Sequence, residues 1–388
     1  MPMARIVLFI LAAAFVLAGL AGAWIFLNPE TPPLDRIEGG EMAAIDSRTG
    51  VYREPEGAER FIAPDLAGGW RMYGTQLPSW AHYDEDGTRT DEPGAIGFTG
   101  GGYVRTLEDA TSREAVRLDP QPFTLSALEV DRDVALHAWL FAPAGEPDRL
   151  VVIVHGSGSS DRRNAYYVLL AQTLARAGAA VVLPDKRGSG RSGGDWRSAD
   201  FDTLAGDAAA FMQAGQARFP GVEPAFVGVS QGGSIAPLAA QIAGVRDIVI
   251  LGAAMVPFHE QLRTEISNDV RAEGIADWLN PAVTTAFAAR ARGRYREFWR
   301  RNGHYDTFEA LDAWDGRAFI AYGQLDEYDN VPVSRSVARL EARFGEDPDV
   351  SWRVYPDVGH ALLTPDYRFH PGFVEDLLGF LDLEPQAR

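Results

Sequence analysis

The sequence predicts an α/β fold in which a mostly parallel, doubly wound sheet carries helices on both faces. Short, continuous apolar runs such as 150–154 and 179–183 are typical of strands that are buried on both faces. Stretches with apolar residues at helical spacing separate these runs. Strands that alternate with helices in this way are expected to lie parallel, because each helical crossover returns the chain to the same end of the sheet.

The predicted strands begin near residue 119. Two runs, 122–130 and 134–141, flank Asp131-Arg132-Asp133 and predict a hairpin. Continuous apolar runs then predict buried strands at 150–154, 179–183 and 225–229, and further strands are expected at 248–251, 318–322 and 350–355. The part of the chain that precedes them, 28–118, shows no strong period of 2 or 3.6. Its scattered aromatic residues indicate that it packs on something rather than staying disordered, but its role is not predicted.

Helices are expected between these strands. The first has Ser160 or Asp161 as its candidate N-cap and Gly178 after its last turn. Others are expected over about 201–219 and over about 373–381.

One long interval, about 258–314, contains no strand-like run and is predicted to be helical, including helices over 261–271 and 284–299. An insertion after a parallel strand lies at the end of the sheet where ligands bind. We therefore expect a helical lid over about 258–314. The alternative is a set of extra helices that only thickens the fold.

The N-terminal residues 1–27 are predicted to be a transmembrane anchor or a signal peptide. Residues 6–27 form an unbroken apolar run, about long enough to cross a bilayer as a helix. A cleaved signal peptide is the alternative, with a small-residue site at Ala21-Gly22-Ala23. Arg5 precedes the run and acidic residues follow it, which predicts a body on the non-cytoplasmic side, periplasmic or extracellular. Cleavage would make the protein secreted.

Composition excludes several classes of function. The 388 residues include 54 acidic and 36 basic side chains, a formal net charge of −18. We therefore expect no nucleic-acid partner, because nucleic-acid binding requires a basic face. The chain has no cysteine, which excludes disulfides, thiolate metal sites and a cysteine nucleophile.

A nucleophile is predicted at Ser230. The sequence Gly228-Val229-Ser230-Gln231-Gly232 fits G-x-S-x-G, with a predicted strand before it and a helix after it. A strand that turns sharply into a helix exposes the middle side chain in a strained conformation, which small residues at both glycine positions permit. A tight turn with an idle serine is the alternative.

A serine hydroxyl needs a base that is held by a third group. His360 is the candidate base, because it lies in a loop between the last predicted strand and the C-terminal helix. The acid is expected to follow the strand at 318–322. Asp326 is favoured because it follows the strand-end glycine most closely, and Asp329 is the alternative.

Two backbone N–H groups are needed to bind the oxyanion that forms during acyl transfer. One is expected from Gln231, immediately after the nucleophile. The other is expected from Ser157, in the glycine-rich loop His155-Gly156-Ser157-Gly158 after the first buried strand. His155 itself is interpreted as part of that turn.

The order Ser230, Asp326, His360 on a parallel sheet resembles that of α/β-hydrolase-fold serine hydrolases. Residues 185–192, DKRGSGRS, also resemble the D-x-R-G-x-G-x-S turn of that family, where it is a structural loop near the active site. Residues 120–388 look most like bacterial esterase and serine-aminopeptidase-like members. The acid loop departs from the family pattern, because members usually have fewer residues between the acid and the Val-Pro pair, here Val331-Pro332. This departure leaves the choice between Asp326 and Asp329 open.

No cofactor or metal is expected. Residues 188–193 match G-x-G-x-x-G, but a polar stretch follows instead of the helix that a dinucleotide site requires. The chain has one lysine, Lys186, to which no chemistry is assigned, and no phosphate-binding loop or metal-spaced histidine pair. Six arginines form a basic cluster, which is either a solvated helix face or a surface for anionic lipid headgroups or an acidic substrate: Arg290, Arg292, Arg294, Arg296, Arg300 and Arg301.

These residues predict a serine hydrolase of small-molecule acyl compounds, preferably carboxylic esters. Peptide and thioester bonds are alternatives for the same residues, as is a non-enzymatic binding protein on a hydrolase scaffold. Esters are preferred because no pair of substrate-anchoring acids, which an aminopeptidase would use, is evident in the predicted lid. A membrane is an expected partner through the N-terminal segment, whereas protein partners and oligomeric state are not predicted.

Overall fold

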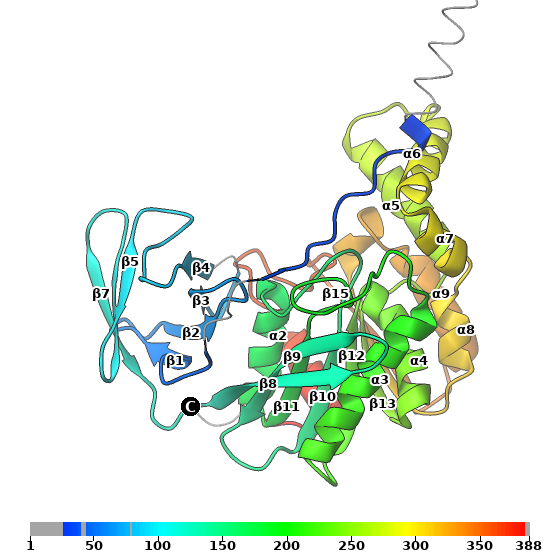
Figure 1. Cartoon of the computed structure of the whole chain (residues 1–388). Helices are drawn as coiled ribbons and strands as arrows, with labels where there is room; N and C mark the ends of the chain where they lie inside the picture. Colours follow the sequence, from blue (N-terminus) through cyan, green and yellow to red (C-terminus); the bar gives the residue numbers. More distant parts are fainter. Residues whose placement is uncertain (1–25, 40–43, 78–79, 385–388) are drawn as a thin grey trace, which may run out of the picture.

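The computed structural model of the protein describes residues 26–39, 44–77 and 80–384, which form two β-sheets and their surrounding helices (Figure 1). The predicted anchor or signal peptide therefore lies, apart from Phe26 and Leu27, outside the described residues. Within those ranges, no helix has both the length and the apolar character needed to span a membrane.

The larger sheet has eight strands in the order β15-β14-β13-β12-β10-β11-β9-β8. The strands from β11 to β15 along this order are parallel, whereas β9 is antiparallel to both β11 and β8. The hairpin and the six later strands expected from the sequence are confirmed, and the last of them is buried only at Val350 and Tyr355. The strands are β8 (Phe123–Asp131), β9 (Ala135–Pro143), β10 (Arg149–Val154), β11 (Ala179–Pro184), β12 (Glu223–Val229), β13 (Asp247–Leu251), β14 (Arg317–Gly323) and β15 (Val350–Tyr355).

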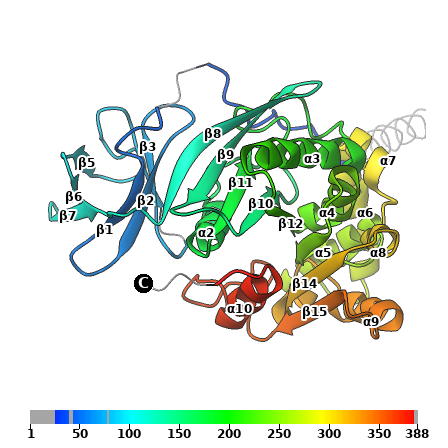
Figure 2. The ribbon, with the colours of Figure 1, turned by 90° about the horizontal axis from the view of Figure 1, so that it is seen from below.

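Helices cover both faces of this sheet, as predicted (Figure 2). Neighbouring residues of one strand bury their side chains in different cores: Val152 packs on the face that carries α3 and α4, and Val151 on the face that carries α2 and α10. This alternation explains the continuous apolar runs, since every residue of a doubly covered strand is buried. The helices are α2 (Ala165–Arg176), α3 (Phe201–Arg218), α4 (Gln231–Ala243), α9 (Val333–Phe344) and α10 (Pro371–Phe380).

The expected N-cap of the first helix is wrong. Asn164 caps α2, and its side chain accepts a hydrogen bond from Tyr166 N. The Asp161 carboxylate instead pairs with Arg163, and the Ser160 hydroxyl lies against His155. Both residues therefore belong to the loop before the helix rather than to the helix end.

The interval 258–314 is a helical insertion between β13 and β14, formed by α5 (Phe258–Ala272), α6 (Asn280–Arg294), α7 (Arg296–Asn302) and α8 (Thr307–Asp312). The single helix expected over 284–299 is wrong, because Tyr295 has non-helical angles of φ −126° and ψ 53° and separates α6 from α7. These helices rise above the end of the sheet (Figure 1). Their function as a lid stays a prediction.

The segment 28–118, which had no readable period, forms a second, antiparallel sheet in the order β4-β3-β2-β1-β7-β6-β5. One face has its own core around Tyr52, Trp70 and Tyr103, and the other places Phe61 and Tyr73 in the core beside α2. The predicted packing of these aromatics is confirmed. The strands are β1 (Gly50–Arg53), β2 (Glu59–Pro64), β3 (Trp70–Tyr73), β4 (Trp80–Tyr83), β5 (Ala95–Phe98), β6 (Gly102–Thr106) and β7 (Ser112–Arg117).

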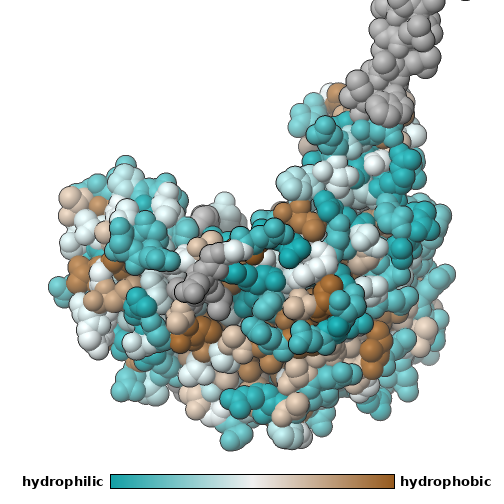
Figure 3. All heavy atoms as spheres, in the orientation of Figure 1, coloured by the Kyte–Doolittle hydropathy of each residue, from teal (hydrophilic) through white to brown (hydrophobic). Residues whose placement is uncertain are grey.

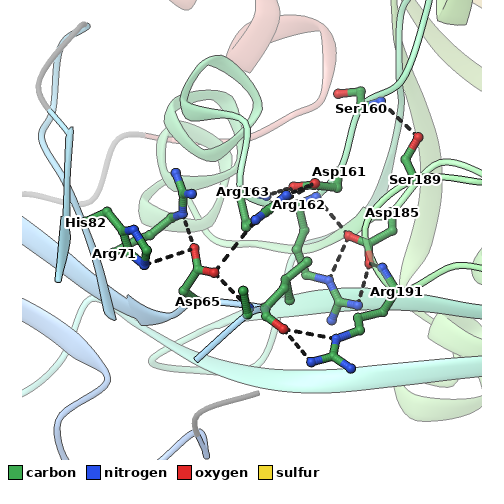
Figure 4. A network of polar contacts seen from close by, with 12 residues as sticks. Asp65, Arg71, His82, Ser160, Asp161, Arg162, Arg163, Asp185, Ser189 and Arg191 are labelled. Carbon is green, nitrogen blue, oxygen red and sulfur yellow. Dashed lines mark hydrogen bonds and ion pairs between the residues drawn. The ribbon is translucent and has the colours of Figure 1, made fainter. Parts of the chain in front are cut away.

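Polar contacts join this N-terminal sheet to the loop 185–192 (Figure 4). The buried carboxylate of Asp65 contacts Arg71 and lies 3.7 Å from Arg163 Nη1. The next residue, Leu66, accepts a hydrogen bond of 3.0 Å from Arg191 Nε through its carbonyl oxygen. Within the loop, the buried Asp185 accepts from Arg162 and from the backbone N–H of Arg191. The N-terminal sheet therefore rests on the loop that also borders the candidate site.

Residues 26–39, here called the N-terminal strap, cross the body from the insertion to the same loop. The ring of Phe26 stacks edge-on against Phe287 of α6, and Arg290 donates to the Phe26 carbonyl oxygen. Further along, Gly190 donates to Asp35 O at 2.9 Å. The strap thus connects α6 with the loop 185–192.

Candidate active site

Ser230 occupies the sharp turn between β12 and α4. Its backbone has φ 53° and ψ −121°, a conformation that is rare for a residue with a side chain. Both glycines of the motif are required by close backbone approaches: a Cβ at Gly228 would lie 2.3 Å from Gly232 O, and one at Gly232 would lie 2.0 Å from Val154 O. The turn places Ser230 at the N-terminus of α4, where the first N–H groups of the helix have no intrahelical acceptor.

His360 and Asp326 are brought together by two loops whose backbones touch. Asp326 follows β14 in a short 3₁₀ helix (Gln324–Tyr328), and His360 lies between β15 and α10. Leu325 N donates to Val358 O at 3.0 Å, which aligns the loops. His360 Nδ1 then lies 2.7 Å from Asp326 Oδ2, and the Asp326 side chain is fully buried. The alternative acid, Asp329, makes no hydrogen bond to His360 within the described residues.

Ser230 and His360 both lie beside the end of β13. Ser230 N donates to Leu251 O at 2.7 Å, and the next residue, Gly252, lies directly against the imidazole. A Cβ at Gly252 would be only 3.0 Å from His360 Cε1. In the described part of the chain, no hydrogen bond joins the Ser230 hydroxyl to the imidazole. Such bonds are often long before a substrate binds.

The charges around His360 act on its protonation. Burial would lower the pKa of His360, but the hydrogen bond to Asp326, and then the negative charges of Asp326, Asp329 and Glu265, raise it by more. The net result is a pKa above the ordinary value of histidine. With Nδ1–H donating to Asp326, the lone pair of Nε2 is available to accept a proton.

The two expected oxyanion donors, Ser157 and Gln231, line one cavity together with Ser230. Gln231 is the first residue of α4, so its N–H lacks an intrahelical partner. Within the described residues the Ser157 N–H makes no hydrogen bond either. Gly156 lies against the nucleophile, since a Cβ there would be 3.4 Å from Ser230 Cβ. Ser157, Gln231 and the nucleophile therefore border the same space.

This cavity has a volume of about 390 Å³ and lies between the sheet and the insertion helices. Its walls are mainly large apolar and aromatic side chains: Trp196, Phe258, Leu262, Tyr295, Phe298 and Trp299. Nearby, Asn268 of α5 donates to the carbonyl oxygens of Glu327 and Asp329, both at 3.1 Å. The insertion is thus bonded directly to the loop that carries Asp326.

Sequence reasoning missed two side chains at this site. Glu265 of α5 lines the cavity, and burial, followed by the charge of Asp269, raises the pKa of its carboxyl group. Lys186 is buried beside the cavity and donates to Gly156 O and Gln231 Oε1, both at 2.7 Å. No pattern in the sequence of the helix that contains Glu265 marks this residue as part of a site. The sequence shows that Lys186 is the only lysine in the chain, but it does not show which groups the side chain contacts.

His155 does not take part in this arrangement as a base. Its Nε2 lies 2.6 Å from Pro184 O and its Nδ1 3.1 Å from Ser160 Oγ, so both ring nitrogens are engaged by the turn. Burial lowers the pKa of His155 to about 4. Among the residues that the structure describes, no group of three or more His, Asp or Glu side chains is arranged to hold a metal ion.

Comparison with known proteins places this geometry in a family. A family model described as "Serine aminopeptidase, S33" matches residues 145–364, which are 220 of the 388 residues. The chain belongs to the S33 serine aminopeptidase family. The sequence resemblance to α/β-hydrolase-fold serine hydrolases is thereby confirmed, and the S33-family chain is a hydrolase of that class.

This S33-family member is similar to several solved structures. An esterase from Pyrococcus furiosus is 18% identical with a TM-score of 0.50, and the match covers 67% of this chain and 91% of that one. A proline iminopeptidase from Mycobacterium smegmatis is 16% identical with a TM-score of 0.46, covering 66% and 98%. Est1E from Butyrivibrio proteoclasticus, bound to ferulic acid, is 21% identical with a TM-score of 0.45, covering 66% and 96%. The likeness to the first of these shows the α/β-hydrolase fold.

Proposed function

We propose that the protein hydrolyses carboxylic esters through Ser230, His360 and Asp326. The observation that carries this proposal is the 2.7 Å contact of His360 Nδ1 with Asp326, next to a serine held on a strained turn at a cavity wall. A buried acid that accepts from one imidazole nitrogen leaves the other free to act as a base. The aromatic and aliphatic cavity walls suit an apolar acyl or alcohol group.

In the proposed reaction, the Ser230 hydroxyl gives its proton to His360 Nε2 while its oxygen bonds to the acyl carbon. The backbone N–H groups of Ser157 and Gln231 donate to the oxyanion that forms. The oxyanion collapses, the alcohol leaves with the proton from His360, and an acyl-enzyme remains. Water then repeats the same steps, which releases the carboxylic acid and restores Ser230.

A specific observation favours one alternative, an aminopeptidase-like activity. Glu265 places a carboxyl group in the wall of the cavity that contains Ser230, and Asp269 and Asp329 act on its charge. A negative group there would favour a substrate with a free amine. Esters remain the first choice, because a single acid stands among mostly apolar walls and the elevated pKa reduces its charge.

The test compares p-nitrophenyl acetate, longer p-nitrophenyl esters and aminoacyl p-nitroanilides as substrates for the full chain. We expect turnover of esters and covalent labelling by a fluorophosphonate probe, both lost in Ser230→Ala. Turnover of the anilides alone would replace the ester by the aminopeptidase function. A folded protein that is not labelled would sink both and leave a binding protein on a hydrolase scaffold.

We also propose that the protein is held at a membrane with its body on the non-cytoplasmic side, and that the insertion forms a lid. The apolar run 6–27 leads directly into the strap, which packs on α6. Exposed apolar side chains lie in the strap (Leu27), in the connection between α5 and α6 (Ile275, Trp278 and Leu279) and on α6 (Phe287). Helices α6 and α7 contain six arginines and one acidic residue, Glu297, which suits anionic headgroups.

A further inference from the structure

Lys186 is a buried amine without a carboxylate partner, and burial lowers the pKa of its ammonium group to about 7. It is 7% exposed, and no carboxylate lies within ion-pair distance of its Nζ among the described residues. Its ammonium group donates to Gly156 O and to Gln231 Oε1, each at 2.7 Å, and lies 5.3 Å from the centre of the Trp196 ring. Removing a charge from water with only neutral partners is costly, and an apolar side chain would fill the same space without that cost.

One acceptor belongs to the Gly156–Ser157 peptide unit and the other to Gln231. The N–H groups of Ser157 and Gln231 are the expected donors to the oxyanion. Gly156 O is the carbonyl of the peptide unit whose N–H belongs to Ser157. In a trans peptide the C=O and the N–H point in opposite directions, so a donor that holds the oxygen directs the N–H away from itself. Gly156 N also donates to Tyr167 Oη at 2.7 Å, which holds the adjacent peptide.

Gln231 is held from its side chain rather than from its backbone. The hydrogen bond from Lys186 to Gln231 Oε1 restrains the first residue of α4, whose N–H is the other expected donor. Gln231 is itself only 2% exposed. One ammonium group therefore restrains both sides of the oxyanion site.

We propose that Lys186 is a positioning residue of the oxyanion hole. Its ammonium group orients the Gly156–Ser157 peptide and Gln231 so that their N–H groups face the developing oxyanion. In its protonated form, the group also polarises the Gly156–Ser157 peptide unit, which strengthens Ser157 N–H as a donor. The inference rests on the proposed function and adds a residue to it. Lys186 touches no reacting atom, so its effect is exerted through these two residues.

The first test substitutes Lys186→Met in the full chain and measures kcat and KM with p-nitrophenyl acetate. We expect kcat to fall by about 10- to 100-fold, somewhat less than the loss of a whole oxyanion donor, because the donors remain but are no longer aligned. KM should change by no more than about twofold, since the ground-state carbonyl depends less on these donors.

Arg149→Met is the matched control. Arg149 is also a buried cation, but it lies at the start of β10, at the opposite end of the sheet from Ser230, where it pairs with Asp247. Arg149→Met should lower the stability of the protein and leave the kcat of the folded enzyme unchanged. Equal kcat values for Lys186→Met and wild type, or equal losses in Lys186→Met and Arg149→Met, would overturn the role of Lys186.

The second test needs no substitution at Lys186. Because it is the only lysine in the chain, lysine labelled with ¹³C at Cε yields one protein signal. Reaction of Ser230 with a fluorophosphonate places a phosphoryl oxygen in the oxyanion site, and we expect the Lys186 signal to shift. The same reagent on Ser230→Ala should leave the signal unchanged.

The two proposals fail separately in this design. A wild-type protein that reacts with the reagent and turns over esters, but whose lysine signal and Lys186→Met kcat do not change, would overturn the positioning role alone. A wild-type protein that neither reacts nor turns over substrate would overturn the proposed function.

Discussion

His360 is the side chain whose charge state controls the proposed chemistry. Its imidazole is hydrogen-bonded to one buried acid, Asp326. The negative charges of Asp329 and Glu265 also favour the protonated form of His360. A base must be neutral to accept the proton of Ser230. The pKa of His360 lies above its ordinary value, so activity should be complete only above that raised pKa and should be lost as the pH falls through it.

Asp329→Asn tests this dependence. Asp329 is exposed, and its charge is one of the causes that raise the pKa of His360. Removing the charge should lower that pKa, so the acid limb of the kcat/KM profile should move to lower pH while the plateau stays the same. Asp315→Asn is the matched control, because Asp315 is an exposed acid just before β14, at the other end of the sheet. An acid limb that does not differ between the two variants would contradict the role given to His360.

At the scale of elements, the site depends on how tightly β12 and α4 approach β10. The Gly232 backbone lies so close to β10 that a Cβ would be 2.0 Å from Val154 O, and backbone atoms cannot move aside as a flexible side chain can. The same crowding holds Ser230 in its strained conformation.

Gly232→Ala should therefore destabilise the fold by about 1–3 kcal/mol, the usual range for overpacking, and should displace Ser230. Denaturant unfolding and fluorophosphonate labelling measure the two effects. Gly379→Ala in α10 is the control, because its Cβ would meet nothing within 4 Å and alanine favours a helix. A Gly232→Ala protein as stable and as reactive as Gly379→Ala would show that the turn tolerates a side chain.

At the scale of the whole molecule, three parts meet around the catalytic sheet. The N-terminal sheet is bonded to the loop 185–192, the strap connects that loop with α6, and the insertion covers the cavity. The face in Figure 3 is hollowed between the part with β1–β7 and the part with the insertion helices. The exposed apolar side chains of the insertion lie near the end of the predicted membrane segment.

A single cysteine tests whether these helices contact a bilayer, because the natural chain has none. Trp278→Cys, at an 80% exposed position, is labelled with an environment-sensitive fluorophore in the full chain, in nanodiscs of equal phosphatidylcholine and phosphatidylglycerol. We expect blue-shifted emission and protection from iodide. Val116→Cys, 68% exposed on β7, should show neither. Equal quenching at both positions would contradict contact of the insertion with the membrane.

The parts of the fold and site that the sequence predicted well are those in which the local environment of each residue restricts which amino acid can occupy it. Continuous apolar runs identified the central strands of the large sheet because burial on both faces leaves few polar positions. The motif around Ser230 predicted its turn because neither glycine position has room for a Cβ. By contrast, the strands of the N-terminal sheet have four to six residues and alternate with Gly- and Pro-rich turns, so no window was long enough to show a period.

The sequence by itself determined the class of fold, the order of the candidate catalytic residues and the place of the insertion, because these depend on local patterns along the chain. Only the tertiary structure decided that Asp326 rather than Asp329 contacts His360, that Glu265 reaches the cavity, and that Lys186 holds Gly156 and Gln231. These contacts join residues from different strands and helices. Their partners are set by the packing of the sheet and not by any spacing in the sequence.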